Sequence, residues 1–277
     1  MFAGKYLKRV IQKIKTSLPD KNSKSNSKNS PDVFSPDPDT EKDSTEGISS
    51  VRSDVQNICP DKEIYSYQNF SFAQEGEDLV LKRIFGLQDR GFYIDVGAHH
   101  PQRFSNTYLF YLQGWRGINI DAMPGSMEKF KELRPGDISI ETAISDSSEE
   151  LTYYIFNEPA LNTFSESISA AKDGLRGYKI IEQVEIKTHK LSDILDMYLP
   201  EGQKIDFLSI DVEGLDHQVL LSNNWSKYKP IVILVEELSM PLEVLVQQSS
   251  TYHFLRKQGY QLFAKTFNTS FYKLVTA

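Results

Sequence analysis

Two short apolar runs in the middle of the chain lead to acidic residues, and this pattern limits the fold more than any other feature. The first run lies within residues 92–98 and carries Asp95, with Gly97 two residues later. The second run, residues 117–121, ends at Asp121. A short apolar run is typical of a parallel strand, because helices cover both faces of a parallel sheet. The carboxyl ends of such strands open onto the crevice where α/β sheets bind ligands.

The chemistry of these residues favours a ligand that contains a nucleoside. Gly97 has no Cβ, so the turn after the first strand can pass close to a ligand. Asp121 stands where a carboxylate accepts hydrogen bonds from a ribose diol. A dinucleotide site needs three glycines around its pyrophosphate, but the turn 97–101 contains one, and the sequence has no Gly-x-x-x-x-Gly-Lys phosphate loop. S-adenosylmethionine, which has ribose and no phosphate, fits better. The alternative is a buried strand followed by a turn that happens to hold glycine.

Strand-like and helical patterns alternate through most of the chain. The expected strands are 92–97, 117–121, 138–144, 205–210, 231–236, 260–265 and 270–275. The expected helices are 75–85 (capped by Ser71), 103–113, 125–133, 191–199, 214–221 and 245–258. Segments 151–156 and 182–188 have strand character and frame a polar excursion at 157–181. Strands that alternate with helices predict an α/β fold with a mainly parallel sheet, and the last two strands predict a hairpin.

An ordered set of blocks extends over most of residues 70–240. The blocks are 72–78, Phe92-Tyr-Ile-Asp-Val-Gly-Ala-His99, 103–108, 114–121, 161–164, Ile205-Asp-Phe-Leu-Ser-Ile-Asp-Val-Glu-Gly214 and 231–236. This set resembles the FkbM-type methyltransferase family. The resemblance implies a class I methyltransferase (Rossmann-like) fold: a mainly parallel seven-stranded sheet, helices on both faces and a C-terminal antiparallel hairpin. Many relatives carry Glu in place of Asp121 and a polar residue in place of Ala122, but either acid can bind a ribose.

The resemblance also implies an enzyme that transfers a methyl group from S-adenosylmethionine to a hydroxyl, often on a sugar, a polysaccharide or a related metabolite. Two other functions stay open. One is a methyltransferase-like module that binds the nucleoside without catalysis, and the other is a nicotinamide-dependent dehydrogenase, which the missing glycines disfavour. The acceptor and the methylated position are not predicted, because specificity lies in loops and in the excursion 157–181.

Residues near the carboxyl ends of the first three strands are expected to bind the cofactor. They are Asp95, Gly97, Ala98, Asn106, Asp121, Ala143 and Ile144. Asp95 and Gly97 would face the methionine and ribose portion, although Asp95 can instead serve as a cap or turn former. Ala143 and Ile144 would border the adenine. Asn106 belongs to a block that matches the family, and the resemblance places it near the cofactor.

Three further residues are expected to contact the acceptor. His99 follows the glycine turn and can reach the crevice, while Asn162 and Thr163 lie in the block 161–164 and can hydrogen-bond an acceptor. For a lone histidine, a structural hydrogen bond is the more common role, so His99 keeps that alternative.

The block after the fourth strand supplies the expected catalytic residues Asp211, Glu213 and His217. Residues at positions i and i+2 of an extended segment point the same way, so Asp211 and Glu213 can converge on one hydroxyl. His217 lies four residues beyond Glu213, and its ordinary pKa of about 6.5 suits a general base. No metal is expected. If a divalent cation binds, Asp211 and Glu213 would be its ligands, but two acids are a weak signature for such ions.

Composition narrows the remaining choices. The chain of 277 residues has a net charge of −7, which argues against general nucleic-acid binding because that needs a basic face. Cys59 is the single cysteine, so no internal disulfide forms. No apolar stretch reaches the roughly 20 residues that a membrane span needs, and the N-terminus lacks the apolar core of a signal peptide. We therefore expect a cytoplasmic protein, with peripheral membrane contact as an open alternative. The family resemblance implies a small-molecule or glycan acceptor. The oligomeric state is not predicted.

The first 60 residues differ from the rest. Residues 1–18 place apolar groups at helical spacing and carry only basic charges, which predicts a basic amphipathic helix. Such a helix either lies peripherally on an anionic membrane, stays a solvated arm, or docks on a protein surface. Residues 19–60 are polar and predict a disordered linker. The methyltransferase domain is expected at 61–277.

Overall fold

The structure is a computed structural model that describes residues 68–238 and 240–275. The expected helix at 1–18, the linker at 19–60 and the expected start of the domain at residue 61 lie outside the described residues. From Phe70 onward the described chain forms one compact unit. Within the described residues, no helix has the length and apolar character that crossing a membrane requires.

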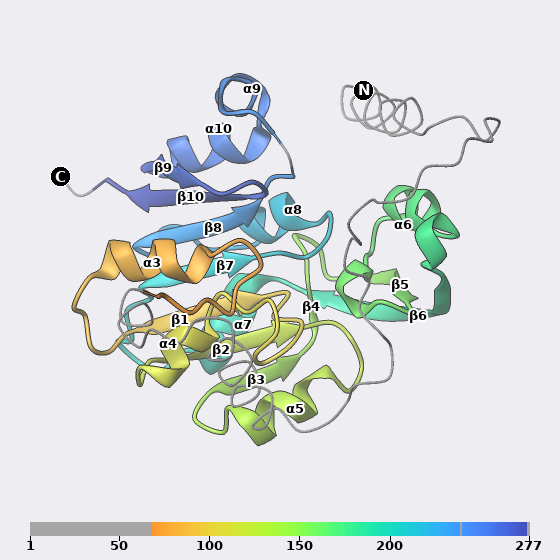
Figure 1. Cartoon of the computed structure of the whole chain (residues 1–277), viewed down its shortest axis with the longest axis horizontal. Coiled ribbons are helices and arrows are strands. Elements are labelled where there is room, and N and C mark those ends of the chain that lie inside the picture. Colours follow the sequence, from red (N-terminus) through yellow and green to blue (C-terminus); the bar gives the residue numbers. More distant parts are fainter. Residues whose placement is uncertain (1–67, 239, 276–277) are drawn as a thin grey trace, which may run out of the picture. The chain divides into compact units, whose positions relative to one another are not determined.

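The main sheet has seven strands. They are β1 (Phe92–Val96), β2 (Arg116–Asp121), β3 (Ile138–Glu141), β7 (Phe207–Ile210), β8 (Val232–Glu236), β9 (Tyr260–Lys265) and β10 (Thr269–Leu274). Their order is β3-β2-β1-β7-β8-β10-β9. The five strands from β3 to β8 pair in parallel, whereas β10 runs antiparallel to both β8 and β9. The predicted class I methyltransferase fold with its C-terminal hairpin is confirmed (Figure 1).

Helices cover both faces of this sheet. They are α3 (Glu77–Phe85), α4 (Tyr108–Leu112), α5 (Ser126–Leu133), α7 (Leu191–Tyr198), α8 (Asp216–Leu221), α9 (Leu242–Gln248) and α10 (Ser250–Lys257). Alternate residues of β1 show the two faces. Tyr93 packs with Leu81 of α3 and Phe110 of α4. Its neighbour Ile94 joins the cluster that contains Leu195 of α7 and residues of α8 and α10. Strands that are buried on both faces explain the apolar runs in the sequence.

Two expected helices differ from the structure. The helix expected at 103–113 begins only at Tyr108, because Phe104 has a left-handed backbone with φ 54° and the Ser105 hydroxyl accepts hydrogen bonds from the next turn. The helix expected at 245–258 is two helices, α9 and α10. They are separated at Ser249, whose extended backbone ends α9 and whose hydroxyl accepts from the Tyr252 amide to begin α10.

Two smaller expectations also need correction. Ser71 does not cap α3, since its hydroxyl donates to the Asp78 carboxylate at 2.6 Å and the N-cap position is Gly76. The strand expected at 138–144 is divided into β3 and the short β4 (Ala143–Ile144), which belongs to another sheet.

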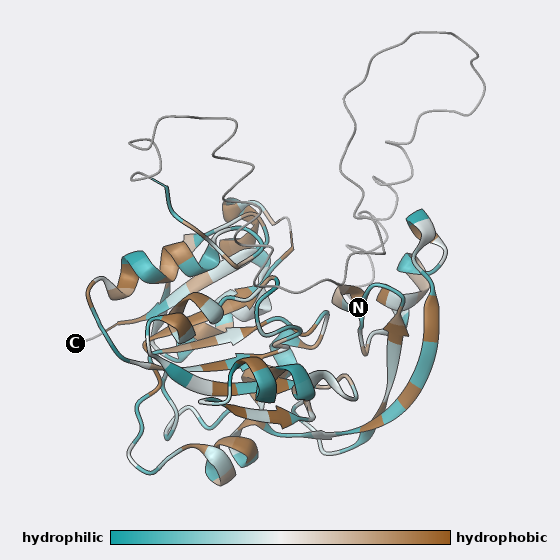
Figure 2. Ribbon diagram, turned by 60° about the horizontal axis from the view of Figure 1, so that its bottom comes forward, coloured by the Kyte–Doolittle hydropathy of each residue, from teal (hydrophilic) through white to brown (hydrophobic). Residues whose placement is uncertain are grey.

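The excursion forms a second unit of structure, and we call residues 150–189 the cap. Its strands β5 (Glu150–Phe156) and β6 (Ile180–His189) form a three-stranded sheet with β4, in the order β4-β6-β5. Between them lie three short helices that the sequence did not predict: η2 (Pro159–Leu161), α6 (Glu166–Lys172) and η3 (Leu175–Gly177). Hydrophilic and hydrophobic residues alternate along the long curved strand of the cap (Figure 2), as expected for a strand with one face exposed.

A buried ion pair ties β1, β2 and the end of α5 together. Arg134 is fully buried, and its Nε lies 2.9 Å from the Asp137 carboxylate. Its Nη2 donates to the Tyr93 hydroxyl, which in turn donates to Asp137 at 2.7 Å. Asp137 also accepts from the Gly117 amide and the Asn119 side chain. Burying charges is costly unless they are paired and hydrogen-bonded, and these contacts meet that requirement.

We predict that Asp137→Ala lowers the free energy of unfolding by about 3–5 kcal/mol, because the Arg134 guanidinium then stays buried without its carboxylate. Urea denaturation followed by circular dichroism measures the change. The control is Asp196→Ala, which removes a solvent-exposed ion pair with Lys227 and should change stability little. A similar loss in both variants would contradict the importance of the buried pair.

Candidate active site

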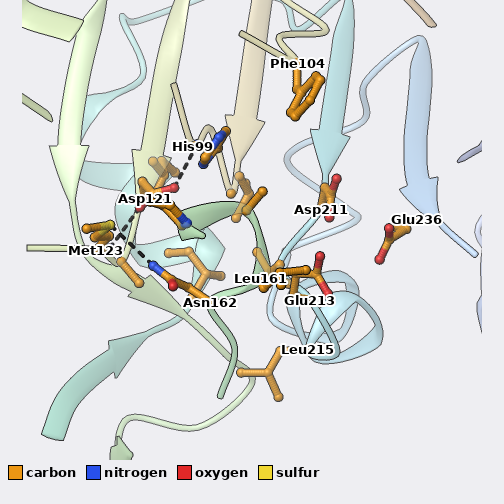
Figure 3. A pocket seen from close by; sticks show the side chains of 18 of the residues that line it. His99, Phe104, Asp121, Met123, Leu161, Asn162, Asp211, Glu213, Leu215 and Glu236 are labelled. Carbon is orange, nitrogen blue, oxygen red and sulfur yellow. Dashed lines mark hydrogen bonds between the residues drawn. The ribbon is translucent and has the colours of Figure 1, made fainter. Parts of the chain in front are cut away.

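A cavity of about 280 Å³ lies at the carboxyl ends of β1, β2, β7 and β8. The main-sheet side contributes Val96, Gly97, Ile120, Asp121, Asp211 and Glu236, among others. The cap contributes Tyr153, Leu161, Asn162 and Phe164 to the lining, and Figure 3 shows Leu161 and Asn162 among them. The strand order reverses between β1 and β7, and this is the position where open α/β sheets bind ligands.

Asp121 ends β2 and presents a carboxylate to the cavity. Its two oxygens accept hydrogen bonds from the backbone amides of His99 and Met123, each at 2.8 Å. Burial raises the pKa of Asp121, and these two hydrogen bonds oppose the rise. A carboxylate has about four lone-pair positions, so Asp121 can still accept from a ligand diol. The same side chain therefore shapes the turn after β1 and offers an acceptor to the cavity (Figure 3).

Gly97 brings two turns into close contact. It has φ 82°, and a Cβ at this position would lie 1.7 Å from the carbonyl oxygen of Asp211. We expected its missing side chain to make room for a ligand. The structure shows that it makes room for the turn after β7, although Gly97 also lines the cavity. Its amide and that of Ala98 both donate to the Ile120 carbonyl, at 2.9 and 3.1 Å.

Of the other expected cofactor residues, three line the cavity and two do not. Asn106, Ala143 and Ile144 are part of its wall. Ala98 is buried in a small cluster with Met127 and Phe130, so its side chain is not available to a cofactor. Asp95 is only 5% exposed and is not part of the wall, and its carboxylate accepts from Thr107 at 2.8 Å. The expectation that Ala98 and Asp95 face the cofactor directly is corrected.

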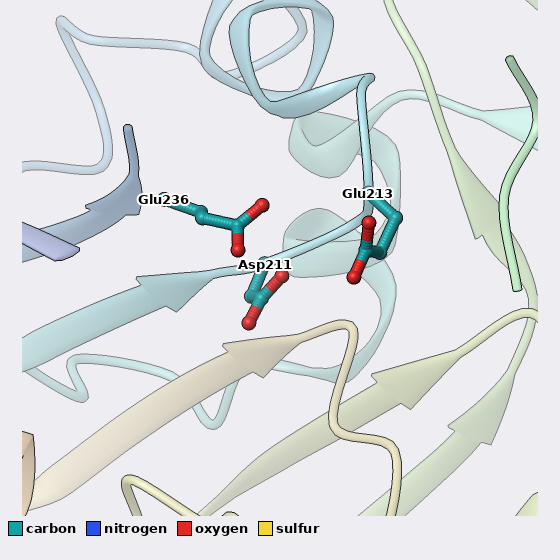
Figure 4. A group of neighbouring side chains, drawn as sticks. All are labelled: Asp211, Glu213 and Glu236. Atoms are coloured by element: carbon teal, nitrogen blue, oxygen red, sulfur yellow. The ribbon is translucent and has the colours of Figure 1, made fainter. Parts of the chain in front are cut away.

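Three carboxylates converge beside the turn after β7, and we call Asp211, Glu213 and Glu236 the acid trio. One oxygen from each lies within 4.8 Å of the others, and Figure 4 shows them turned toward one another. Asp211 is accessible from the cavity, but the surrounding protein reduces its hydration. This effect, together with the nearby Asp216 and Glu213, raises the pKa of Asp211 well above its usual range. Burial and then Asp211 raise the pKa of Glu236 to about 10. Near neutral pH the trio therefore keeps a proton.

Sequence reasoning missed Glu236, although a signal was present. Glu236 ends the apolar run 231–236, just as Asp121 ends 117–121. The trio also offers the oxygen ligands that hard divalent cations prefer. Among the described residues, these three side chains have ligand atoms close enough to one another to hold one metal ion. A cation bound there would have Glu236 as a ligand in addition to the expected Asp211 and Glu213.

The cap holds the backbone that carries the trio. Glu213 has a left-handed φ of 51°, which is unusual for a residue with a side chain. The Thr163 hydroxyl donates to the Glu213 carbonyl at 2.5 Å, and Lys172 lies 2.9 Å from the Glu213 carboxylate. Thr163 is fully buried and also accepts from the Ser165 amide. The prediction that Thr163 binds the acceptor is therefore corrected, because its hydroxyl positions Glu213 instead.

His217 does not reach the cavity. Its ring packs edge-on against Phe254 with 5.8 Å between centroids, and its Nδ1 lies 3.5 Å from the Thr251 hydroxyl. The reason is the backbone: the chain turns at Glu213, and α8 begins only at Asp216, so the four-residue spacing is not a helical turn. The expected catalytic role of His217 is corrected.

His99 and Asn162 lie in the cavity wall, as the sequence suggested for acceptor contacts. Burial lowers the pKa of His99, and its ring stacks on Phe104 at 6.4 Å. The Asn162 oxygen accepts from the Phe156 amide at 2.8 Å and its nitrogen contacts the Met123 sulfur at 3.3 Å. Asn162 thus ties the cap to the turn after β2, and the acceptor contact stays a prediction.

Tyr153 of β5 is a wall residue that no sequence signal indicated. Its side chain is 7% exposed and packs on Phe164 with 4.5 Å between ring centroids. Burial raises its pKa far above the usual range, so the phenol stays protonated and can donate a hydrogen bond. Tyr153 lies in the segment 151–156, and the strand pattern of this segment does not indicate that it borders a ligand site.

Comparisons with solved structures found methyltransferases with low similarity to this chain. The chain is similar to a TehB-like SAM-dependent methyltransferase from Corynebacterium glutamicum, with a TM-score of 0.35 and 9% identity over 83% of this chain and 100% of that one. It is also similar to precorrin-6y C5,15-methyltransferase from Geobacter metallireducens, with a TM-score of 0.34 and 14% identity over 74% of this chain and 89% of that one. A search of curated proteins found no match.

The family comparison covers more than half of the sequence. The methyltransferase FkbM domain matches residues 95–262, which are 168 of the 277 residues. The matched range begins in β1 and ends in β9, and it contains Asp121, the acid trio and the whole cap. The chain belongs to the FkbM methyltransferase family.

Proposed function

We propose that this protein is an S-adenosylmethionine-dependent methyltransferase that methylates a hydroxyl of a sugar, a polysaccharide or a related metabolite. The observation that carries the proposal is one cavity lined by two separate acidic features, Asp121 and the acid trio. Asp121 offers a carboxylate suited to a ribose diol, and the acid trio offers a proton acceptor. Membership of the family supports methyl transfer, and the oxygen acceptor is the part that needs a test.

The residues of the cavity suit this cofactor. Asp121 can accept from the ribose hydroxyls, while Ala143, Ile144 and Leu215 give an apolar wall for adenine. The amides of Gly97 and Ala98 are already bonded to the Ile120 carbonyl, so this turn offers no free amides to cradle a pyrophosphate. That arrangement disfavours a dinucleotide. When bound, S-adenosylmethionine supplies an electrophilic methyl group on a sulfonium sulfur.

The acid trio supports proton removal from the acceptor. A neutral hydroxyl is a poor nucleophile, and a well-placed base typically increases the rate by about 10²–10⁴-fold. Asp211 and Glu213 are suited to take this proton because both line the cavity. The proton that the trio keeps reduces the repulsion among its three carboxyl groups. Lys172 offsets the charge of Glu213. Orientation of the reactants against the cap wall can contribute a further 7–11 kcal/mol or so.

Thermal shift with three compounds distinguishes the candidate functions. S-adenosylmethionine and S-adenosylhomocysteine should raise the melting temperature, because each can place its ribose on Asp121. NAD should not raise it, because NAD also needs a pyrophosphate site. Incubation with labelled S-adenosylmethionine and a panel of sugars, glycolipids and cell extract then tests transfer. Stabilisation without any transfer would indicate a binding module, and stabilisation by NAD alone would indicate a dehydrogenase.

The place of the reaction in the cell stays a prediction. We propose the cytoplasm, with peripheral membrane contact through residues 1–18. Sedimentation with anionic vesicles compares the full chain with a chain that starts at residue 19. Equal sedimentation of the two would remove the membrane contact from the proposal.

We predict that Asp121→Ala weakens binding of S-adenosylhomocysteine by roughly 10- to 150-fold, since a hydrogen bond to a charged group contributes about 1.5–3 kcal/mol. Isothermal titration calorimetry measures the affinity without an acceptor. The matched control is Glu141→Ala, because Glu141 pairs with Asp121 in the sheet register but does not line the cavity. Unchanged affinity in a folded Asp121→Ala protein would contradict the ribose assignment.

We predict that Asp211→Asn lowers kcat by about 10²–10⁴-fold and leaves the affinity for S-adenosylhomocysteine nearly unchanged. Because the pKa of Asp211 is raised, its base form is lost as pH falls, so the parent rate should increase with pH and the variant rate should not. Steady-state rates from pH 6 to 10 measure this, with the exposed Glu243→Gln as control.

A chelator distinguishes two possible roles of the acid trio, a general base and a binding site for a divalent cation. If the trio acts as a base, EDTA should leave turnover unchanged. Loss of turnover with EDTA and recovery with Mg²⁺ would instead assign the trio to a divalent cation.

A further inference from the structure

A chain of buried hydrogen bonds leads from the core to Asn106 on the cavity wall. Both Nη atoms of Arg134 lie 3.0 Å from the Thr107 hydroxyl. Thr107 donates to the Asp95 carboxylate at 2.8 Å. Ser209 of β7 is the neighbour of Asp95 in the sheet register, and its hydroxyl helps to lower the pKa of Asp95. Asn106 then donates from Nδ2 to the Ser209 hydroxyl at 3.0 Å. Arg134 and Thr107 are 0% exposed, Ser209 1% and Asp95 5%, so water does not compete for these bonds.

The donor and acceptor roles in this chain follow from its first member. Arginine can only donate, so the Thr107 hydroxyl accepts from Arg134 and gives its single proton to Asp95. An ionised carboxylate can only accept, so it favours a Ser209 hydroxyl whose proton is turned toward Asp95 and whose oxygen is left to accept. Asn106 must therefore turn its NH₂ group toward Ser209. The carbonyl oxygen of Asn106 has no hydrogen-bond partner among the residues that the structure describes. Because Asn106 lines the cavity, this oxygen is available to a ligand.

We propose that Arg134, Thr107, Asp95 and Ser209 are positioning residues that fix the Asn106 carbonyl oxygen as an acceptor for a cationic N–H donor, the ammonium group of the cofactor's amino-acid portion. The inference rests on the proposed function, because it assumes that the cofactor occupies this cavity. It gives Asp95 a role that differs from the direct contact expected from the sequence. Asp95 acts on the ligand through Ser209 and Asn106 rather than by touching it.

The charge of Asp95 connects this chain to pH. Burial raises the pKa of Asp95 to about 6, while the Arg134 charge and the hydrogen bonds from Thr107 and Ser209 lower it. The charged groups around it are Arg134 beyond α5, Asp121 at the end of β2 and Asp211 after β7. Above this pH the carboxylate accepts and the chain keeps its direction. Below it, protonated Asp95 can donate to Ser209, and Asn106 is no longer held with its oxygen free.

The test compares two ligands in one variant. S-adenosylhomocysteine carries the ammonium group, whereas 5′-methylthioadenosine has the same adenosine without the amino-acid portion. Ser209→Ala should weaken the binding of S-adenosylhomocysteine by about tenfold and leave the affinity for 5′-methylthioadenosine unchanged. Titration calorimetry measures both affinities. The control is Ser139→Ala on β3, a strand serine whose hydroxyl has no partner among the described residues. It should change neither affinity.

A pH series and a second variant complete the experiment. In the parent, the preference for S-adenosylhomocysteine over 5′-methylthioadenosine should decrease when the pH is lowered past about 6. In Ser209→Ala this preference should not change with pH. Asn106→Ala, at the cavity surface, should show the same selective loss and serves if Ser209→Ala does not fold. Equal loss of both ligands, or no loss of S-adenosylhomocysteine, would overturn the positioning role. Failure of the parent to bind either ligand would overturn the proposed function, and this inference with it.

Discussion

The buried guanidinium of Arg134 is the constraint on which the rest of the site depends. A charge without access to water must be surrounded by acceptors, and Arg134 obtains them from β1, from the loop after α5 and from the start of α4. These partners bring the carboxyl half of β1 and the residues before α4 into one arrangement. Asn106 and Phe104, which lie on this segment, then become part of the cavity wall. A stability requirement of the core thus also orients the surface that a ligand meets.

A second constraint joins the turn after β1 to the turn after β7. The turn at Gly97 lies so close to the Asp211 carbonyl that only a residue without a side chain fits. On the other side, the cap packs on Gly214, where an added Cβ would lie 2.9 Å from the Ile168 side chain. The backbone between them, including the left-handed Glu213, is held by Thr163 from the cap. Because such a conformation costs free energy unless its surroundings hold it, the position of Glu213 in the acid trio depends on the cap being in place.

The sequence was sufficient for the sheet and for residues at strand ends, and insufficient where a side chain's direction depends on a turn. Asp121 and Asp211 were found because parallel strands bring their carboxyl ends to one edge. His217 and Ala98 were misplaced because each follows a residue with an unusual backbone, Glu213 or Gly97. The start of α4 was misplaced for the same reason at Phe104. These backbone angles result from long-range contacts, which periodicity does not contain.

The cap shows a different limit of sequence reasoning. Tyr153 lies on an alternating strand that looks like a surface strand, and it becomes part of the site only because the cap faces the main sheet. Thr163 looks like an acceptor contact and is instead committed to Glu213. Glu236 could have been recognised, because it ends an apolar run on a strand next to β7. Glu236 differs from Tyr153 and Thr163 in how far along the chain the informative contact reaches. A strand end is visible in the local sequence, whereas a cap contact such as that of Thr163 joins segments about fifty residues apart.

The charge of the cavity narrows the ligands that it suits. Asp121, Asp211, Glu213 and Glu236 all contribute carboxyl groups, which remain net negative even though the trio keeps one proton. Lys172 is already paired with Glu213. A phosphorylated acceptor would meet repulsion at this wall, since like charges at short range oppose binding when water is partly excluded. A neutral polyol would instead find acceptors for its hydroxyl protons, and a cationic cofactor would find compensating charge. The electrostatics therefore disfavour an anionic acceptor and agree with the neutral acceptor of the proposed function.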